Sequence, residues 1–166
     1  MTYLSEELYR TITDNIPIVC IDIVPVKKVD SSWQIGVATL STGPEAGKLA
    51  IFGGRVQHNE TILDAIKRHL SQDLDINNFS FYGINNVARP FHVQEYLHQK
   101  TAEPPHCYDP TKHAVSLIYL INLDDEPKPK NEVSDFRWIS RDQVPAISAY
   151  NQLVVMNLAF EALNQG

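Results

Sequence analysis

The residues best suited to chemistry lie between Gly53 and Ile76, in the sequence GGRVQHNETILDAIKRHLSQDLDI. Two adjacent glycines open this segment, and we expect a helix from Ile62 to about Leu74 with Thr61 as its N-cap. Its apolar face is formed by Leu63, Ile66, Leu70 and Leu74. A second face, about 100° away, carries Ala65, His69, Gln72, Asp73 and Ile76. A glycine loop beside polar helical side chains suits a bound cation and phosphate groups.

Gly54, Glu60 and Arg68 have the spacing of a known signature. With them, the segment resembles the signature box of the Nudix hydrolase superfamily. That pattern has glutamate at positions 69, 72 and 73 and glycine at 75, where this sequence has His69, Gln72, Asp73 and Asp75. The box is therefore degenerate, and most of the changes fall on positions that bind metal in the family.

Within this superfamily, the chain is most similar to the GDP-mannose mannosyl hydrolases along most of its length. The shared motifs, in the same order, are Ile16–Val19, Ile21-Asp22, Gly53–Gln57, Glu60-Thr61, Phe81–Gly83, His113–Val115 and Asp135–Trp138. The resemblance implies an α+β fold, an α/β/α sandwich in which a Nudix-like mixed β-sheet lies between helices. It also implies Mg²⁺-dependent hydrolysis of a nucleoside diphosphate sugar, GDP-mannose-like, or of a related nucleoside diphosphate derivative.

The resemblance assigns a metal site to three residues. Gly53 corresponds to a loop glycine whose carbonyl binds metal, and Asp73 to the helical carboxylate that these enzymes keep as a ligand. Glu132 stands where they have a glutamine ligand. We expect a single weak Mg²⁺ site here, completed by substrate phosphate and water. The competing interpretation is that Glu132 is a solvated turn residue and that Asp73 pairs with a base such as Arg55.

Catalytic and substrate-binding roles follow from the same resemblance. Arg55 is similar to the arginine that stabilises charge on the departing diphosphate, and Asp22 to an aspartate that contacts the substrate. Asp22 interrupts an apolar strand, where a carboxylate needs a partner or a ligand. Arg68 is a further candidate for substrate binding, although its spacing from Glu60 favours a structural clamp between loop and helix.

The expected general base is missing. Val133 occupies the position of the histidine base of the mannosyl hydrolases, and valine cannot transfer a proton. A second diphosphate-binding arginine of that family falls near Leu40 and is also absent. Glu132, Asp22 or a loop histidine would have to replace the base, or turnover is slow. The alternative from a different class is a catalytically silent Nudix-like module that binds a nucleotide-type ligand.

Hydrophobic patterning predicts one domain over residues 1–166, with helical ends at 1–16 and 149–164. The predicted strands are Ile18–Val26, Trp33–Thr39, Leu49–Phe52, Phe79–Arg89, His113–Leu123 and Val133–Ile139. A polar segment at 97–112 is long enough to suggest a lid-like loop. The expected core residues are Val19, Ile21, Ile51, Phe52, Leu63, Ile66, Leu70, Leu117, Tyr119 and Trp138.

Composition narrows the class of partner. The net charge is −6 and no run of Lys and Arg exceeds two residues, which argues against a nucleic-acid partner. No apolar stretch approaches the roughly 18 residues that cross a bilayer, and the N-terminus does not resemble a signal peptide. We therefore expect a cytoplasmic protein that binds no membrane. The resemblance implies a homodimer.

Metal sites other than Mg²⁺ receive little support from the sequence. The two cysteines, Cys20 and Cys107, cannot form a disulfide scaffold, and Cys20 lies in an apolar run typical of a buried thiol. The spacing of His98, His106, Cys107 and His113 fits no compact zinc pattern. His69 is more typical of a hydrogen-bonded helical side chain than of a metal ligand.

Overall fold

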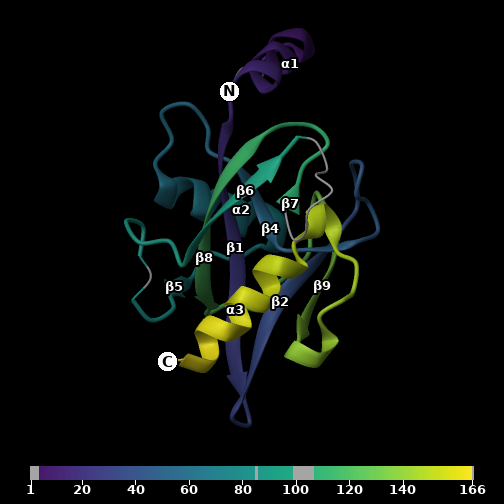
Figure 1. Ribbon diagram of the computed structural model, residues 1–166. Coiled ribbons are helices and arrows are strands. Elements are labelled where there is room, and N and C mark those ends of the chain that lie inside the picture. Colours follow the sequence, from purple (N-terminus) through teal and green to yellow (C-terminus); the bar gives the residue numbers. More distant parts are fainter. Residues whose placement is uncertain (1–3, 85, 99–106, 166) are drawn as a thin grey trace.

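The computed structural model describes residues 4–84, 86–98 and 107–165 and consists of a mixed β-sheet between helices (Figure 1). The helices are α1 (Glu6–Asn15), α2 (Ile62–Leu74) and α3 (Leu153–Gln165), with two short 3₁₀ turns at Arg141–Gln143 and Ala149–Asn151. The strands are β1 (Ile18–Val29), β2 (Ser32–Leu40), β3 (Leu49–Ala50), β4 (Phe52–Arg55), β5 (Phe79–Phe81), β6 (His92–Leu97), β7 (Cys107–Tyr108), β8 (Ala114–Leu123) and β9 (Val133–Ile139).

Strand β1 organises the sheet, because it pairs with three others. It runs parallel to β8 and antiparallel to β2 and β4. The main path has the order β3-β2-β1-β8-β6-β7, with β4 on β1, β5 on β8 and β9 on β2. Residues 20–26 of β1, Asp22 included, are all buried, as expected for a largely apolar strand covered on both faces.

Two apolar clusters fill the space between the sheet and its helices. Helix α3 lies in front of the sheet in Figure 1 and α2 behind it. On the α3 side, Val155, Met156 and Phe160 are buried against strand residues. On the α2 side, Ile66, Leu70 and Leu74 are fully buried together with Ile21 and Ile23. The predicted apolar face of residues 62–74 is therefore the face that packs on the sheet.

Helix α2 has the expected boundaries for clear local reasons. The Thr61 hydroxyl accepts a hydrogen bond from the Asp64 N–H at 3.1 Å and so caps the first turn. At the other end, Asp75 adopts a left-handed conformation with φ 58°, which stops the helix. Helix α1 is capped in the same way by Ser5 and stands away from the sheet in Figure 1. Among the described residues, no helix is long and apolar enough to cross a membrane.

The predicted long strand Phe79–Arg89 is wrong beyond Phe81. The chain turns at Gly83, where φ is 62°, and a strand that the sequence prediction missed, β6, follows at His92–Leu97. Pro90, which lacks a backbone N–H, separates the two. In the predicted loop 97–112, residues 99–106 lie outside the described residues, while Cys107–Tyr108 form β7 beside β6. A lid function for this segment stays a prediction.

The C-terminal helix and four predicted core residues also differ from expectation. Tyr150 and Asn151 have positive φ, so a 3₁₀ turn at Ala149–Asn151 precedes α3 instead of one continuous helix from 149. Val19 is 51% exposed, although it shares a face with the buried Ile21, because the apolar face of α2 packs further along β1. The other three expected core residues that are only half-buried are Leu63, Leu117 and Trp138.

Shortening Leu70 tests the packing of α2 on the sheet. Leu70→Ala should lower the free energy of unfolding by about 2–5 kcal/mol, because it leaves a cavity in a fully buried cluster. Val19→Ala is the matched control and should cost less than about 1 kcal/mol, since Val19 is half exposed. Urea denaturation measures both values, and equal losses for the two variants would contradict this packing.

Candidate functional site

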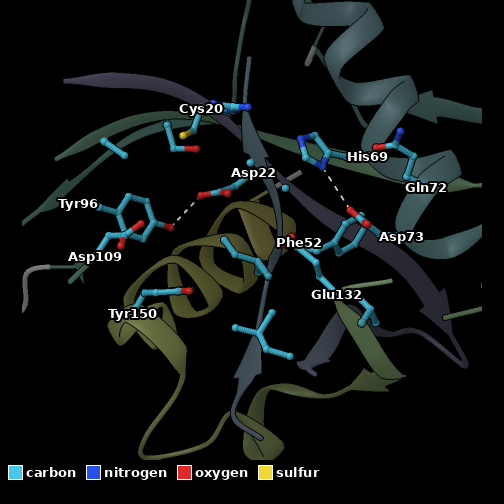
Figure 2. Close-up of a pocket in the computed structure, with 18 of the residues that line it drawn as sticks. Cys20, Asp22, Phe52, His69, Gln72, Asp73, Tyr96, Asp109, Glu132 and Tyr150 are labelled. Carbon is cyan, nitrogen blue, oxygen red and sulfur yellow. Dashed lines mark hydrogen bonds and ion pairs between the residues drawn. The ribbon is translucent and has the colours of Figure 1, made fainter. Parts of the chain in front are cut away.

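A polar cavity of about 620 Å³ lies between β1, β4, the polar face of α2 and the residues just before α3 (Figure 2). Beside it, β4 packs so closely on β1 and α2 that Gly53 and Gly54 leave no room for side chains. A Cβ at Gly53 would lie 2.1 Å from the Ile21 carbonyl oxygen, and one at Gly54 would lie 2.8 Å from the His69 ring. These glycines were expected to open a loop, but both belong to β4, where Gly53 pairs with Asp22. The loop begins only after Arg55.

The loop between β4 and α2 is held by Arg68. Its guanidinium donates to Glu60 through Nε to Oε1 at 2.6 Å and through Nη2 to Oε2 at 2.9 Å. Nη2 also donates to the Arg55 carbonyl at 2.9 Å, and Glu60 Oε2 accepts from the Gln57 N–H at 2.8 Å. The hydrogen bond from Arg68 lowers the pKa of the Glu60 carboxyl. The clamp expected from the spacing of these two residues is thus present.

His69 and Asp73 form a pair on the cavity side of α2 (Figure 2). Arg68 Nη1 lies 3.2 Å from His69 Nε2, and His69 Nδ1 lies 3.2 Å from Asp73 Oδ2. A guanidinium can only donate, so Nε2 accepts, and the neutral ring carries its proton on Nδ1 and donates it to Asp73. Both ring nitrogens are therefore engaged. Asp73 pairs with His69 and not with Arg55, the partner suggested above.

The residues present do not fit a preformed Mg²⁺ site. Gly53, Asp73 and Glu132 all line the cavity. However, Asp73 accepts from His69, and Glu132 is an exposed residue whose carbonyl accepts from the Ser41 N–H. Within residues 4–84, 86–98 and 107–165, no three His, Cys, Asp or Glu side chains come close enough to hold a metal ion. Of the four residues considered above for zinc, His98, Cys107 and His113 are among the residues searched, and His106 lies outside the described residues.

Asp22 lies at the bottom of the cavity, in a chain of hydrogen bonds that the sequence did not reveal. Tyr96 donates to Asp22 Oδ2 at 2.8 Å, Gln152 Nε2 donates to the Tyr96 oxygen at 3.0 Å, and the Ile51 N–H donates to Gln152 Oε1 at 3.0 Å. Burial raises the pKa of the Asp22 carboxyl, and the Tyr96 hydrogen bond opposes this rise. Asp22 thus has a structural partner and still faces the cavity.

Arg55 lies at the end of β4, with its guanidinium 5.0 Å from the centre of the Tyr9 ring of α1. Among the described residues it makes no ion pair, in contrast to Arg68. Sequence reasoning missed Tyr96, Lys112, Ser116 and Gln152, which also line the cavity. They come from three segments that are far apart in the sequence, and no local motif marks them. The His69–Asp73 pair did carry a signal, since residues four apart on a helix are neighbours.

A family profile described as "Domain of unknown function (DUF4916)" matches residues 1–161. The chain belongs to this family. No curated protein matches it. Structural similarity is more informative about the fold. A possible asymmetric diadenosine tetraphosphate (Ap4A) hydrolase from Jonesia denitrificans is 26% identical, with a TM-score of 0.75 over 90% of this chain and 96% of that one.

Two further solved structures share the fold of this DUF4916 chain. The NUDIX domain of Shewanella oneidensis NrtR, solved with ADP ribose, is 16% identical with a TM-score of 0.65, over 96% of this chain and 99% of that one. An Ap4A hydrolase from C. elegans is 15% identical with a TM-score of 0.61, over 87% of this chain and 98% of that one. The Nudix α/β/α sandwich is thereby confirmed. The finer likeness to GDP-mannose mannosyl hydrolases stays a prediction, as do a homodimer and a cytoplasmic location.

The buried carboxyl of Asp22 predicts how the melting temperature of the protein depends on pH. Burial raises the pKa of the Asp22 carboxyl in the folded state above its unfolded value of 3.8. The protonated carboxyl therefore contributes fully to the stability of the fold below pH 3.8, and this contribution is lost as the pH rises through the folded pKa. Asp22→Asn removes this loss, so the variant should melt higher than the parent at pH 7.5, and the difference should shrink towards pH 4. Thermal denaturation across this range measures it. A difference independent of pH, or one shared by the exposed Asp14→Asn, would contradict the assignment.

Proposed function

We propose that this protein binds a nucleoside diphosphate derivative in the cavity, and that binding rather than rapid turnover is its main activity. The observation that carries the proposal is Arg55, a cation with no acidic partner among the described residues, at the edge of a polar cavity of about 620 Å³. This volume falls within the range of small-molecule sites, about 300–1,000 Å³. A guanidinium matches the oxygen atoms of a phosphate group through paired hydrogen bonds.

The fold comparisons support a nucleotide as the rest of the ligand. The names of the similar proteins mention Ap4A and ADP ribose, two nucleotides that contain linked phosphates. Aromatic side chains at Tyr9, Phe52 and Tyr150 line the same cavity and offer apolar surface to a base. A screen that includes ADP-ribose and GDP-mannose would identify the base and the group beyond the diphosphate.

Three features favour binding over fast hydrolysis. Val133 cannot act as a base, and a positioned base contributes about 10²–10⁴-fold to rate. Both nitrogens of His69 are already hydrogen-bonded. Asp73, the helical carboxylate expected to bind Mg²⁺, accepts from His69, so metal binding there would compete with this hydrogen bond. Among the described residues, the chain therefore offers a polar cavity for binding without a ready-made catalytic centre.

Mg²⁺-dependent hydrolysis of a nucleoside diphosphate derivative is the second candidate. It is favoured by the 26% identity with the possible Ap4A hydrolase. When bound with substrate, Mg²⁺ would stabilise charge on the leaving phosphate groups. Glu132 and Asp22 are then the remaining candidates for the base, and Arg55 for stabilising the leaving diphosphate. Gly53, Asp73 and Glu132 are the proposed ligands, with a nucleotide sugar as the finer substrate class.

A ligand screen tests the first candidate. At 100 times its Kd, a bound nucleoside diphosphate derivative should stabilise the folded protein by about 2.7 kcal/mol, and the melting temperature should rise accordingly. Arg55→Met should weaken binding at least about tenfold, because it removes a charged hydrogen bond to phosphate. Arg141→Met, at an exposed arginine paired with Glu161, is the control and should bind like the parent. If no member of the screen shifts the parent protein, the proposed ligand class is wrong.

Substitution of the expected metal ligands separates the two candidates. If binding is the main activity, Asp73→Asn and Glu132→Gln should bind ADP-ribose with nearly the parent affinity in both Mg²⁺ and EDTA, as calorimetric titration would show. If hydrolysis with Mg²⁺ is the activity, both variants should lose affinity and turnover in Mg²⁺ only. That second result would replace the binding proposal with the hydrolase.

A further inference from the structure

Three side chains form a row across the sheet at one end of the cavity. In the register of the strands, Arg55 of β4 pairs with Cys20 of β1, and Cys20 pairs with Ser116 of β8. Side chains of directly paired residues point to the same face of a sheet. Arg55 and Ser116 therefore flank Cys20 on the face that lines the cavity.

Lys112 brings a second positive charge to this row. It precedes β8 and its ammonium group forms an ion pair with Asp109 at 2.5 Å, with only 20% of the lysine side chain exposed. Asp109 is fixed in turn by the N–H and hydroxyl of Thr111, at 2.8 and 2.6 Å. Burial raises the pKa of the Cys20 thiol to about 12, and the charges of Lys112 and Arg55 both act on it in the opposite direction. Both cations thus lie near Cys20.

Ser116 provides an independent sign of a ligand. It is 1% exposed and lines the cavity. Its hydroxyl has no partner at full hydrogen-bond distance among the residues that the structure describes, and its one polar interaction is with the buried Asp22 carboxyl, whose pKa it lowers. A buried hydroxyl without a partner costs about 1–3 kcal/mol, so such groups are normally satisfied. A ligand oxygen bound beside Cys20 would supply the missing hydrogen bond.

We propose that Arg55, Lys112 and Ser116 form the phosphate-binding subsite of the cavity, and that they hold a diphosphate without a metal ion. This inference rests on the proposed function and adds where the phosphates bind. An ammonium group has three N–H donors, so Lys112 can bind Asp109 and a phosphate oxygen together. The Ser116 hydroxyl donates to a second oxygen, and Arg55 closes the subsite from β4.

The distribution of carboxyl groups agrees with this position. Asp73 and Glu132 lie towards α2 and β9, at the other side of the cavity from Cys20 (Figure 2). Two carboxyl groups lie nearer to the subsite. Asp109 is paired with Lys112, and Asp22 accepts a hydrogen bond from Tyr96. A diphosphate beside Cys20 therefore lies away from Asp73 and Glu132.

Calorimetric titration with ADP-ribose, in EDTA and again in Mg²⁺, tests the subsite. Lys112→Met should weaken binding at least about tenfold in both conditions, since a charged hydrogen bond is lost. Ser116→Ala should weaken binding about threefold or more with little change in melting temperature, because in the unliganded protein its hydroxyl makes only a weak interaction with Asp22. Lys67→Met, at an exposed lysine on α2 outside the cavity, is the matched control.

The outcomes are distinct. If the parent protein binds ADP-ribose and the Lys112 and Ser116 variants bind equally well, the subsite is wrong while the proposed function stands. If binding requires Mg²⁺ and is lost on Asp73→Asn, the phosphates lie at α2 and the subsite is again wrong. If the parent binds neither ADP-ribose nor inorganic pyrophosphate, both proposals fail. Lys112→Met leaves Asp109 without its cation, which lowers stability if the charge stays buried. If the Lys112→Met variant has a reduced melting temperature, the Ser116→Ala result decides between these outcomes.

Discussion

The cavity depends on one half-buried guanidinium. Arg68 joins Glu60, the Arg55 carbonyl and the His69 ring, so it connects the loop, the end of β4 and helix α2. Its paired hydrogen bonds to Glu60 have the planar geometry that arginine and carboxylate share, and the two side chains are only 17% and 12% exposed. Removing either partner would leave a charge with little water around it. The position of Arg55, and with it the edge of the cavity, is therefore set by Arg68.

The same clamp shapes the chemistry of α2. By donating to His69 Nε2, Arg68 fixes the proton of the neutral ring on Nδ1, and that proton holds Asp73. A carboxylate that could bind metal is thereby engaged with its own helix. Arg55 and Lys112, the latter paired with Asp109, lie instead towards Cys20, where the buried Ser116 also lines the cavity. The chain has the Nudix fold, whereas residues 69, 72, 73 and 75 of its signature segment differ from the family pattern.

Local patterns in the sequence predicted much of this framework. The 3.6-residue periodicity and Thr61 gave α2 its bounds, and the run from Ile18 gave the central strand. Prediction failed where geometry depends on distant residues. Strand β6 (HVQEYL) lacks a regular alternation of polar and apolar residues and follows closely after Pro90, so the sequence did not reveal it. The hydrogen bonds of Asp22 come from Tyr96 and, through it, Gln152, both far along the chain. The ion pair of Glu60 and Arg68 could be predicted because the two residues have the spacing of the family signature. The neighbours of Cys20 on the sheet have no sequence signature and follow only from the register of the strands.

The central claim is that this cavity holds a nucleoside diphosphate derivative intact and without metal. Phosphorus NMR of ADP-ribose mixed with an equal amount of protein in EDTA, followed by addition of Mg²⁺, tests it most directly. The diphosphate resonances should shift or broaden on mixing, Mg²⁺ should change them little, and their total intensity should stay constant over hours. Unperturbed resonances in EDTA, or the appearance of phosphomonoester signals after Mg²⁺ is added, would contradict it.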